Sequence, residues 1–124
     1  MKKSLILLFT LFIISFCEAK PVAVFKEVIH NFGIIKAETP VKHTFKFSNR
    51  GNSILIIERI KAGCGCTGTI LSSREIQAGG SGELEVELSA DPGSGKIEKV
   101  IYVFTNDPVH RIIKIILKAT VTDN

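Results

Sequence analysis

Residues 41–49 read VKHTFKFSN, and this stretch decides the fold class. Val41, His43, Phe45 and Phe47 alternate with polar residues and so share one face of an extended chain. An alternation of period two is the signal of a β-strand with one buried face. A helix would instead place its apolar residues three and four positions apart. We therefore predict a strand that carries these four side chains on one face.

The same alternation recurs along the rest of the chain. ELEVELS, residues 83–89, places Leu84, Val86 and Leu88 inward and leaves Glu83, Glu85 and Glu87 as a solvated outer face. KVIYVFTN (99–106) offers Val100, Tyr102 and Phe104 as one face, and RIIKIILKATV (111–121) offers Ile113, Ile115, Leu117, Ala119 and Val121. SILIIERI (53–60) is apolar on both faces, which favours a central strand packed on two sides.

Turn-forming residues separate these segments. NRGN (49–52), AGGSG (78–82), DPGSG (91–95) and NDP (106–108) supply the glycine, proline, asparagine and aspartate that turns prefer. About seven antiparallel strands follow, near 22–29, 32–36, 41–49, 53–61, 83–89, 97–105 and 111–122. This spacing predicts an all-β immunoglobulin-like sandwich. The chain has no tryptophan, which excludes the antibody type with its tryptophan-packed disulfide.

The first nineteen residues have the pattern of a secretory signal peptide. Two lysines precede an apolar run, and Cys17-Glu18-Ala19 supplies small residues at the positions that precede a cut after Ala19. The apolar run is short of the roughly 20 residues that span a bilayer. Two alternatives stay open, a retained N-terminal anchor and lipidation at Cys17. We expect one domain over residues 20–124, exported to the periplasm or secreted, with no membrane span after cleavage.

Composition and motifs narrow the function. The formal net charge is +4, but basic and acidic residues are interleaved and form no basic stripe, so we expect no nucleic-acid partner. Neither a nucleophile elbow, nor HExxH, nor a phosphate-binding P-loop occurs in the chain. Glu27, Glu38 and Glu75 have no partner that the sequence can name. We therefore expect no enzymatic activity.

Several short motifs together resemble a known family. NFG (31–33), FSNRG (47–51), CGCT (64–67), the IQAGGSG turn (76–82) and FTN (104–106) resemble the family catalogued as domain of unknown function 1573. Its members are exported bacterial proteins, and it is related to the ASPM–SPD-2–Hydin and major-sperm-protein domains. The resemblance covers nearly all of residues 20–124. It implies an immunoglobulin-like fold and an export route, and it implies no enzymatic activity.

The segment AGCGCTGTI (62–70) holds two cysteines on either side of Gly65. Its glycines predict a loop or bulge just after the strand at 53–61. Cys64 and Cys66 allow three interpretations. They form a structural feature of the turn, either reduced or as a local disulfide. They form a redox pair, since the small ring of such a disulfide would be strained and easily reduced. Or they bind a soft metal ion, with copper favoured over zinc.

A closed metal site would need more ligands than two thiolates, and the histidines are the candidates. His43 lies on an apolar strand face, where a histidine is more often a hydrogen-bonded core residue than a ligand. His30 and His110 are expected to be exposed, and no two histidines have the spacing of metal ligands on a helix or a hairpin. We expect no other cofactor.

The sequence therefore predicts a non-enzymatic, exported immunoglobulin-like domain. Such sandwiches bind partners through their end loops and free sheet edges. We expect a protein-interaction or scaffolding module of the bacterial cell envelope, whose partner is another envelope protein or a glycan. The alternative is a thiol redox or copper-binding protein that uses Cys64 and Cys66.

Overall fold

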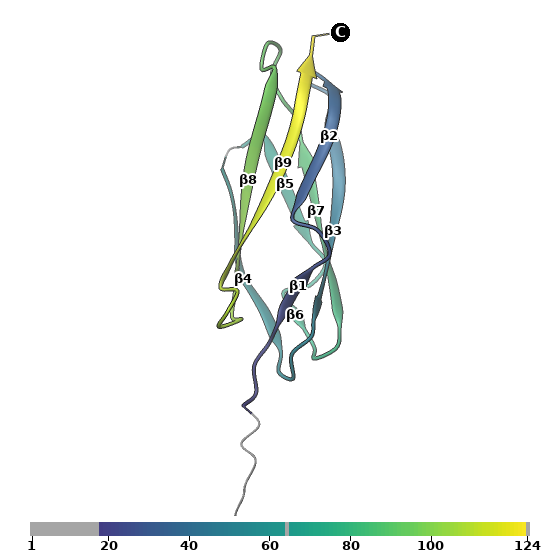
Figure 1. Ribbon diagram of the computed structural model, residues 1–124. Helices are drawn as coiled ribbons and strands as arrows, with labels where there is room; N and C mark the ends of the chain where they lie inside the picture. Colours follow the sequence, from purple (N-terminus) through teal and green to yellow (C-terminus); the bar gives the residue numbers. More distant parts are fainter. Residues whose placement is uncertain (1–17, 64, 124) are drawn as a thin grey trace, which may run out of the picture.

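A computed structural model describes residues 18–63 and 65–123 of the chain as an elongated two-layer sandwich (Figure 1). Within these residues every regular element is a strand. The strands are β1 (Ala23–Phe25), β2 (Ile29–Lys36), β3 (Val41–Asn49), β4 (Leu55–Ala62), β5 (Thr67–Leu71), β6 (Glu75–Ile76), β7 (Ser81–Leu88), β8 (Lys96–Thr105) and β9 (Ile112–Thr122). The signal peptide was predicted for residues 1–19, and the alternatives were a retained anchor and lipidation at Cys17. All but Glu18 and Ala19 of this segment lie outside the described residues.

The strands form two sheets. Sheet A has the order β1-β3-β7-β5, and sheet B has the order β2-β9-β8-β4-β6. The predicted fold class, an all-β immunoglobulin-like sandwich, is confirmed. All pairs are antiparallel except β2 and β9, which run parallel. No helix in the described part of the chain has the length and apolar character needed to cross a membrane.

The strand predicted at 22–29 is in fact divided between the sheets. β1 pairs with β3 only as far as Phe25, and Lys26 N still donates to Lys46 O at 3.0 Å. Val28 O then accepts from Ile116 N at 2.8 Å, so the chain has crossed to sheet B. Residues 26–28 therefore form a crossover, which places β1 and β2 on facing sheets. Alternation alone could not show this, because either sheet accepts the same pattern.

Two short strands were not predicted. β5 begins at Thr67 and pairs with β7, although the glycines of this segment indicated a loop or bulge. β6 has only two residues, which pair with Leu55 and Ile56 of β4. β4 also differs from the expected two-sided central strand. Leu55 and Ile57 are buried, but Ile56 on its other face is 38% exposed, because sheet B has no third layer over its outer side.

The core lies between the sheets and follows the predicted alternation. Phe45 and Phe47 of β3 and Leu84, Val86 and Leu88 of β7 are buried, and Glu83, Glu85 and Glu87 face outward. From β9, Ile115, Leu117, Ala119 and Val121 are buried, and Ile113 packs against them. The face formed by Val100, Tyr102 and Phe104 is the outer one, since Ile101 and Val103 fill the core. Burying one such aliphatic side chain stabilises the folded state by about 1.5–3 kcal/mol relative to leaving it exposed.

Asn49 fixes the turn after β3. Its side chain is fully buried, its Nδ2 donates to Ser53 O at 2.7 Å and to Ile76 O at 3.0 Å, and its Oδ1 accepts from Val22 N and Gly51 N. One side chain thus satisfies four backbone groups, two in the turn, one before β1 and one in β6. This explains why NRGN forms a tight connection and holds the start of β1 against it.

Candidate functional site

The cysteine segment is described only in part. Cys66 is half-buried and disulfide-bonded, and Ser89 N donates to its carbonyl oxygen at 3.1 Å, which ties the segment to the end of β7. Cys64 lies outside the described residues. The pairing of Cys64 with Cys66, and the redox and copper-binding roles proposed for them, therefore stay predictions.

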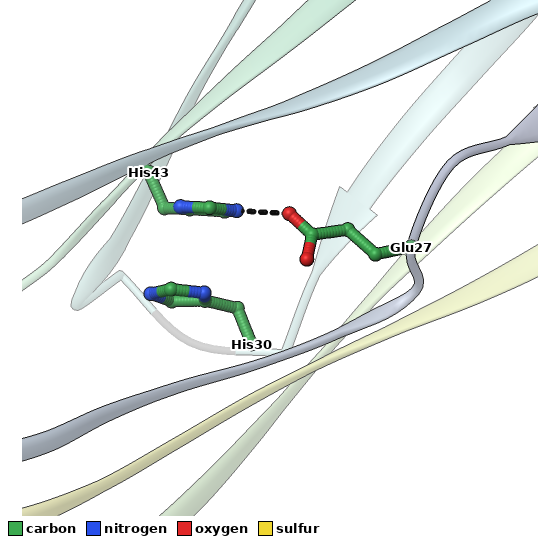
Figure 2. A group of neighbouring side chains, drawn as sticks. All are labelled: Glu27, His30 and His43. Atoms are coloured by element: carbon green, nitrogen blue, oxygen red, sulfur yellow. Dashed lines mark hydrogen bonds and ion pairs between the residues drawn. The ribbon is translucent and has the colours of Figure 1, made fainter.

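His30 and His43 lie face to face at one edge of the sandwich. Their ring centroids are 3.5 Å apart and their planes differ by 10° (Figure 2). His30 pairs with Leu117 in sheet B and His43 pairs with Val86 in sheet A, so both side chains point into the space between the sheets. His30, which was expected to be exposed, is half-buried, and the sequence spacing of the histidines did not indicate this contact. Their proximity comes from the crossover, which brings β2 opposite β3.

Glu27 lies in the crossover and completes the group. Its Oε1 contacts His43 Nε2 as a hydrogen bond or ion pair (Figure 2). The side chain of Glu27 is 44% exposed and that of His43 is 23% exposed, so the group opens to solvent on the Glu27 side. From the sequence, Glu27 had no identifiable partner, and His43 was expected to be a hydrogen-bonded core residue. The structure supplies the partner for both.

Aromatic rings enclose the inner side of this group. Phe32 meets His30 edge-on with centroids 4.6 Å apart, and Phe45 meets His43 edge-on at 4.8 Å. Burial lowers the pKa of His30 below its ordinary value of 6.5, and the neighbouring His43 lowers it further, while Glu27 opposes the change. His30 is accordingly neutral at pH 7 and keeps a lone pair on one ring nitrogen.

One ligand atom from each of Glu27, His30 and His43 lies within 4.8 Å of the other two. Among the described residues this is the one group of three or more histidine, cysteine or acidic side chains that comes so close together. Cys66 is not part of it, and neither is His110. The three positions are 27, 30 and 43, a spacing with no local motif, so only the pairing of β2 and β3 with their sheets reveals the group.

His110 takes part in a different arrangement, around the buried carboxylate of Asp107. Asp107 Oδ2 accepts from Ala23 N at 2.9 Å and lies 2.9 Å from His110 Nδ1, and its Oδ1 accepts from Val109 N at 2.9 Å. Burial alone would raise the pKa of Asp107, but these hydrogen bonds outweigh it and lower the pKa below 3.8. The His110 side chain is 51% exposed, as expected. This arrangement joins the β8–β9 turn to β1 and is structural.

The outer faces of the two sheets differ in character. On sheet A, Lys42 lies 3.7 Å from Glu85 and 3.9 Å from Glu87, and among the described residues the one large exposed apolar side chain beside them is Ile70. On sheet B, Ile29, Ile116 and Val100 form one apolar row across three strands. We call this row, together with a second row formed by Ile112 and Phe104, the outer face of sheet B.

The second row of the outer face of sheet B is aromatic. Ile112 pairs with Phe104, and the Arg59 guanidinium lies 4.2 Å from the centroid of the Phe104 ring. Ile29 is 51% exposed and Ile112 is 58% exposed, and Tyr102 lies between the two rows. A face that combines exposed aliphatic and aromatic side chains with an arginine has the composition of a protein-binding surface.

Solved structures share this architecture. A protein of unknown function from Porphyromonas gingivalis W83 is 21% identical, covers 86% of this chain and 50% of its own length, and superimposes with a TM-score of 0.74. The ASH/PapD-like domain 7 of human CEP192 is 7% identical, covers 91% of this chain and 94% of its own, with a TM-score of 0.68. The VesB protease of Vibrio cholerae is 11% identical, with a TM-score of 0.62 over 83% of this chain and 32% of its own.

These likenesses define the class of the fold, an immunoglobulin-like sandwich of the PapD-like kind. The chain spans half the length of the Porphyromonas structure. No curated protein sequence matches the chain significantly. The sequence profile of the protein family of unknown function DUF1573 matches residues 23–121. The chain belongs to this family, as its CGCT, FSNRG and FTN motifs predicted.

Proposed function

We propose that the chain is a non-enzymatic, exported protein-interaction module of the bacterial cell envelope. The PapD-like fold is compatible with a role in protein interaction, and the N-terminal sequence is compatible with export. Neither feature identifies a partner. The observation that carries the proposal is the difference between the two outer faces. On the outer face of sheet A, as far as the structure describes it, Lys42 lies between Glu85 and Glu87 and Ile70 is a single exposed apolar side chain, whereas sheet B exposes two apolar rows.

The charges around the apolar rows indicate the kind of partner. Lys61 and Lys114 pair with Tyr102 on the same face, and Lys118 lies beyond the first row. A surface of isoleucine, tyrosine and lysine suits a protein with an apolar patch bordered by acidic residues. We therefore favour an envelope protein over a glycan as the partner.

Site-directed photo-crosslinking tests the proposal. A photoreactive amino acid at Tyr102, in the outer face of sheet B, should yield a crosslinked partner in intact cells that express the protein. The same amino acid at Thr44, which lies on the outer face of sheet A, is the matched control. Discrete adducts at Thr44 and none at Tyr102 would contradict the assignment of the face.

Introducing a charged side chain on each outer face gives an independent test. Ile112→Glu should reduce recovery of the partner at least about tenfold, because it places a carboxylate within an apolar contact. Thr44→Lys, which introduces a charge opposite Glu85 on the outer face of sheet A, should leave recovery unchanged. Both positions are on the outer faces, so neither change is expected to alter the free energy of unfolding by more than about 0.5 kcal/mol. Equal recovery for both variants would refute the proposal.

The disulfide at Cys66 is compatible with the alternative function as a thiol redox protein, whereas copper binding would need the cysteines reduced to thiolates. Cys66 is disulfide-bonded and half-buried, at the end of the sandwich where β5 begins. Replacing both Cys64 and Cys66 with serine separates the two functions. Partner recovery through the outer face of sheet B should survive this change, whereas a redox or copper-binding activity should disappear.

A further inference from the structure

The group at the sheet crossover contains a ligand set that neither the interaction surface nor the cysteine segment uses. Glu27 comes from the crossover, His30 from β2 of sheet B, and His43 from β3 of sheet A. We propose that these three side chains bind one divalent transition-metal ion of the zinc class. This site goes beyond the proposed function and does not depend on it.

The three ligand atoms lie close enough to reach one ion if the two stacked rings rotate apart. Zinc binds imidazole nitrogen and carboxylate oxygen at about 2.0–2.2 Å, which in tetrahedral geometry places two ligand atoms about 3.3 Å apart. The three ligand atoms here already lie within 4.8 Å of one another. The Glu27 carboxylate is exposed and can move toward the rings, but the imidazole planes are nearly parallel, so binding one ion requires the two rings to rotate out of the stack until their lone pairs converge (Figure 2).

The chemistry of the donors selects the metal. Two imidazoles and one carboxylate suit zinc and other borderline divalent ions, whereas Cu(I) prefers thiolate or thioether ligands. This separates the site from the copper site suggested at Cys64 and Cys66. Three protein ligands leave a fourth position, which on the exposed Glu27 side is open to water.

A simple ion pair accounts for only part of the arrangement. The contact between Glu27 and His43 explains these two residues, but His30 enters the stack from the opposite sheet. Phe32 contacts His30 edge-on and Phe45 contacts His43 edge-on, so packing holds both imidazoles beside Glu27, where the three side chains can act as one ligand set.

Titration of the purified protein with Zn²⁺ tests the proposal. All free thiols are first alkylated with iodoacetamide, so that no thiolate competes for the ion. Calorimetry should then show one Zn²⁺ bound per chain. His30→Gln, His43→Gln and Glu27→Gln should each weaken binding by more than the roughly 10- to 100-fold that loss of an outer-shell partner costs. His110→Gln, which removes a histidine outside the group, should bind as tightly as the unchanged protein.

NMR of the unchanged protein keeps the test independent of how well the variants fold. On addition of Zn²⁺, the imidazole resonances of His30 and His43 should shift together, while those of His110 stay in place. Bound Zn²⁺ should also raise the unfolding temperature, because an ion that binds only the folded state stabilises it. An absence of saturable binding, or a shift confined to His110, would overturn the proposal.

Discussion

Removing the carboxylate of Asp107 should destabilise the sandwich more than almost any other change at its surface turns. The Asp107 side chain is 1% exposed and joins the β8–β9 turn to β1 through Ala23 N, Val109 N and His110 Nδ1, each at 2.9 Å. A hydrogen bond to a charged group contributes about 1.5–3 kcal/mol, and an orphaned buried donor costs about 1–3 kcal/mol. Because these contributions overlap, we expect Asp107→Ala to lose about 3–5 kcal/mol.

Asp107→Asn refines the estimate, because it keeps one acceptor oxygen and removes the charge. It should lose roughly half as much, about 1.5–3 kcal/mol. The free energy of unfolding is measured by urea denaturation, read from the midpoint with the slope unchanged. Asp91→Ala, an exposed aspartate in the turn at the other end of β8, should cost less than about 0.5 kcal/mol. The reasoning fails if Asp107→Ala costs less than about 1 kcal/mol.

The same carboxylate predicts a dependence on pH. The folded-state pKa of Asp107 is lowered below its ordinary value of 3.8, so the folded protein binds this proton less readily than the unfolded chain does. The stabilisation is fully present above pH 3.8 and is lost as the pH falls below it. Urea unfolding between pH 5 and pH 3 should show this loss in the unchanged protein and a smaller loss in Asp107→Asn. Parallel curves for the two would contradict the assignment.

Three further changes test the packing and the surface. Leu84→Ala should cost about 2–5 kcal/mol in urea unfolding, because it leaves a cavity at a fully buried position; a cost below 1 kcal/mol would mean that the core collapses around it. Gly82→Ala should cost about 1–3 kcal/mol, since the new Cβ would lie 2.5 Å from Cζ of the buried Phe47 ring; an unchanged midpoint would contradict this crowding. Lys42→Ala should change stability by no more than about 0.5 kcal/mol, because its ion pairs with Glu85 and Glu87 are exposed; a larger loss would show that the pairs form a cooperative network.

How far sequence reasoning reaches differs between the fold and the candidate site. The inner faces of β3 and β7 were predicted residue by residue, because alternation in a strand is a property of the chain's own geometry. β5 was missed, because TGTIL takes its strand conformation from hydrogen bonds to β7 and not from its own glycine-containing sequence. The same limit applied to β6, whose two residues pair only because Leu55 and Ile56 lie beside them.

By itself, the sequence determined which side chains share a strand face, where the chain turns, and to which family the chain belongs. These properties depend on residues close together in the chain or on short motifs. The tertiary structure alone decided that the chain crosses between sheets after Phe25 and that β2 runs parallel to β9. That crossover places Glu27 and His30 against His43. Local conformational preference does not decide which strands face each other; the free energy gained by burying one apolar core between two sheets does.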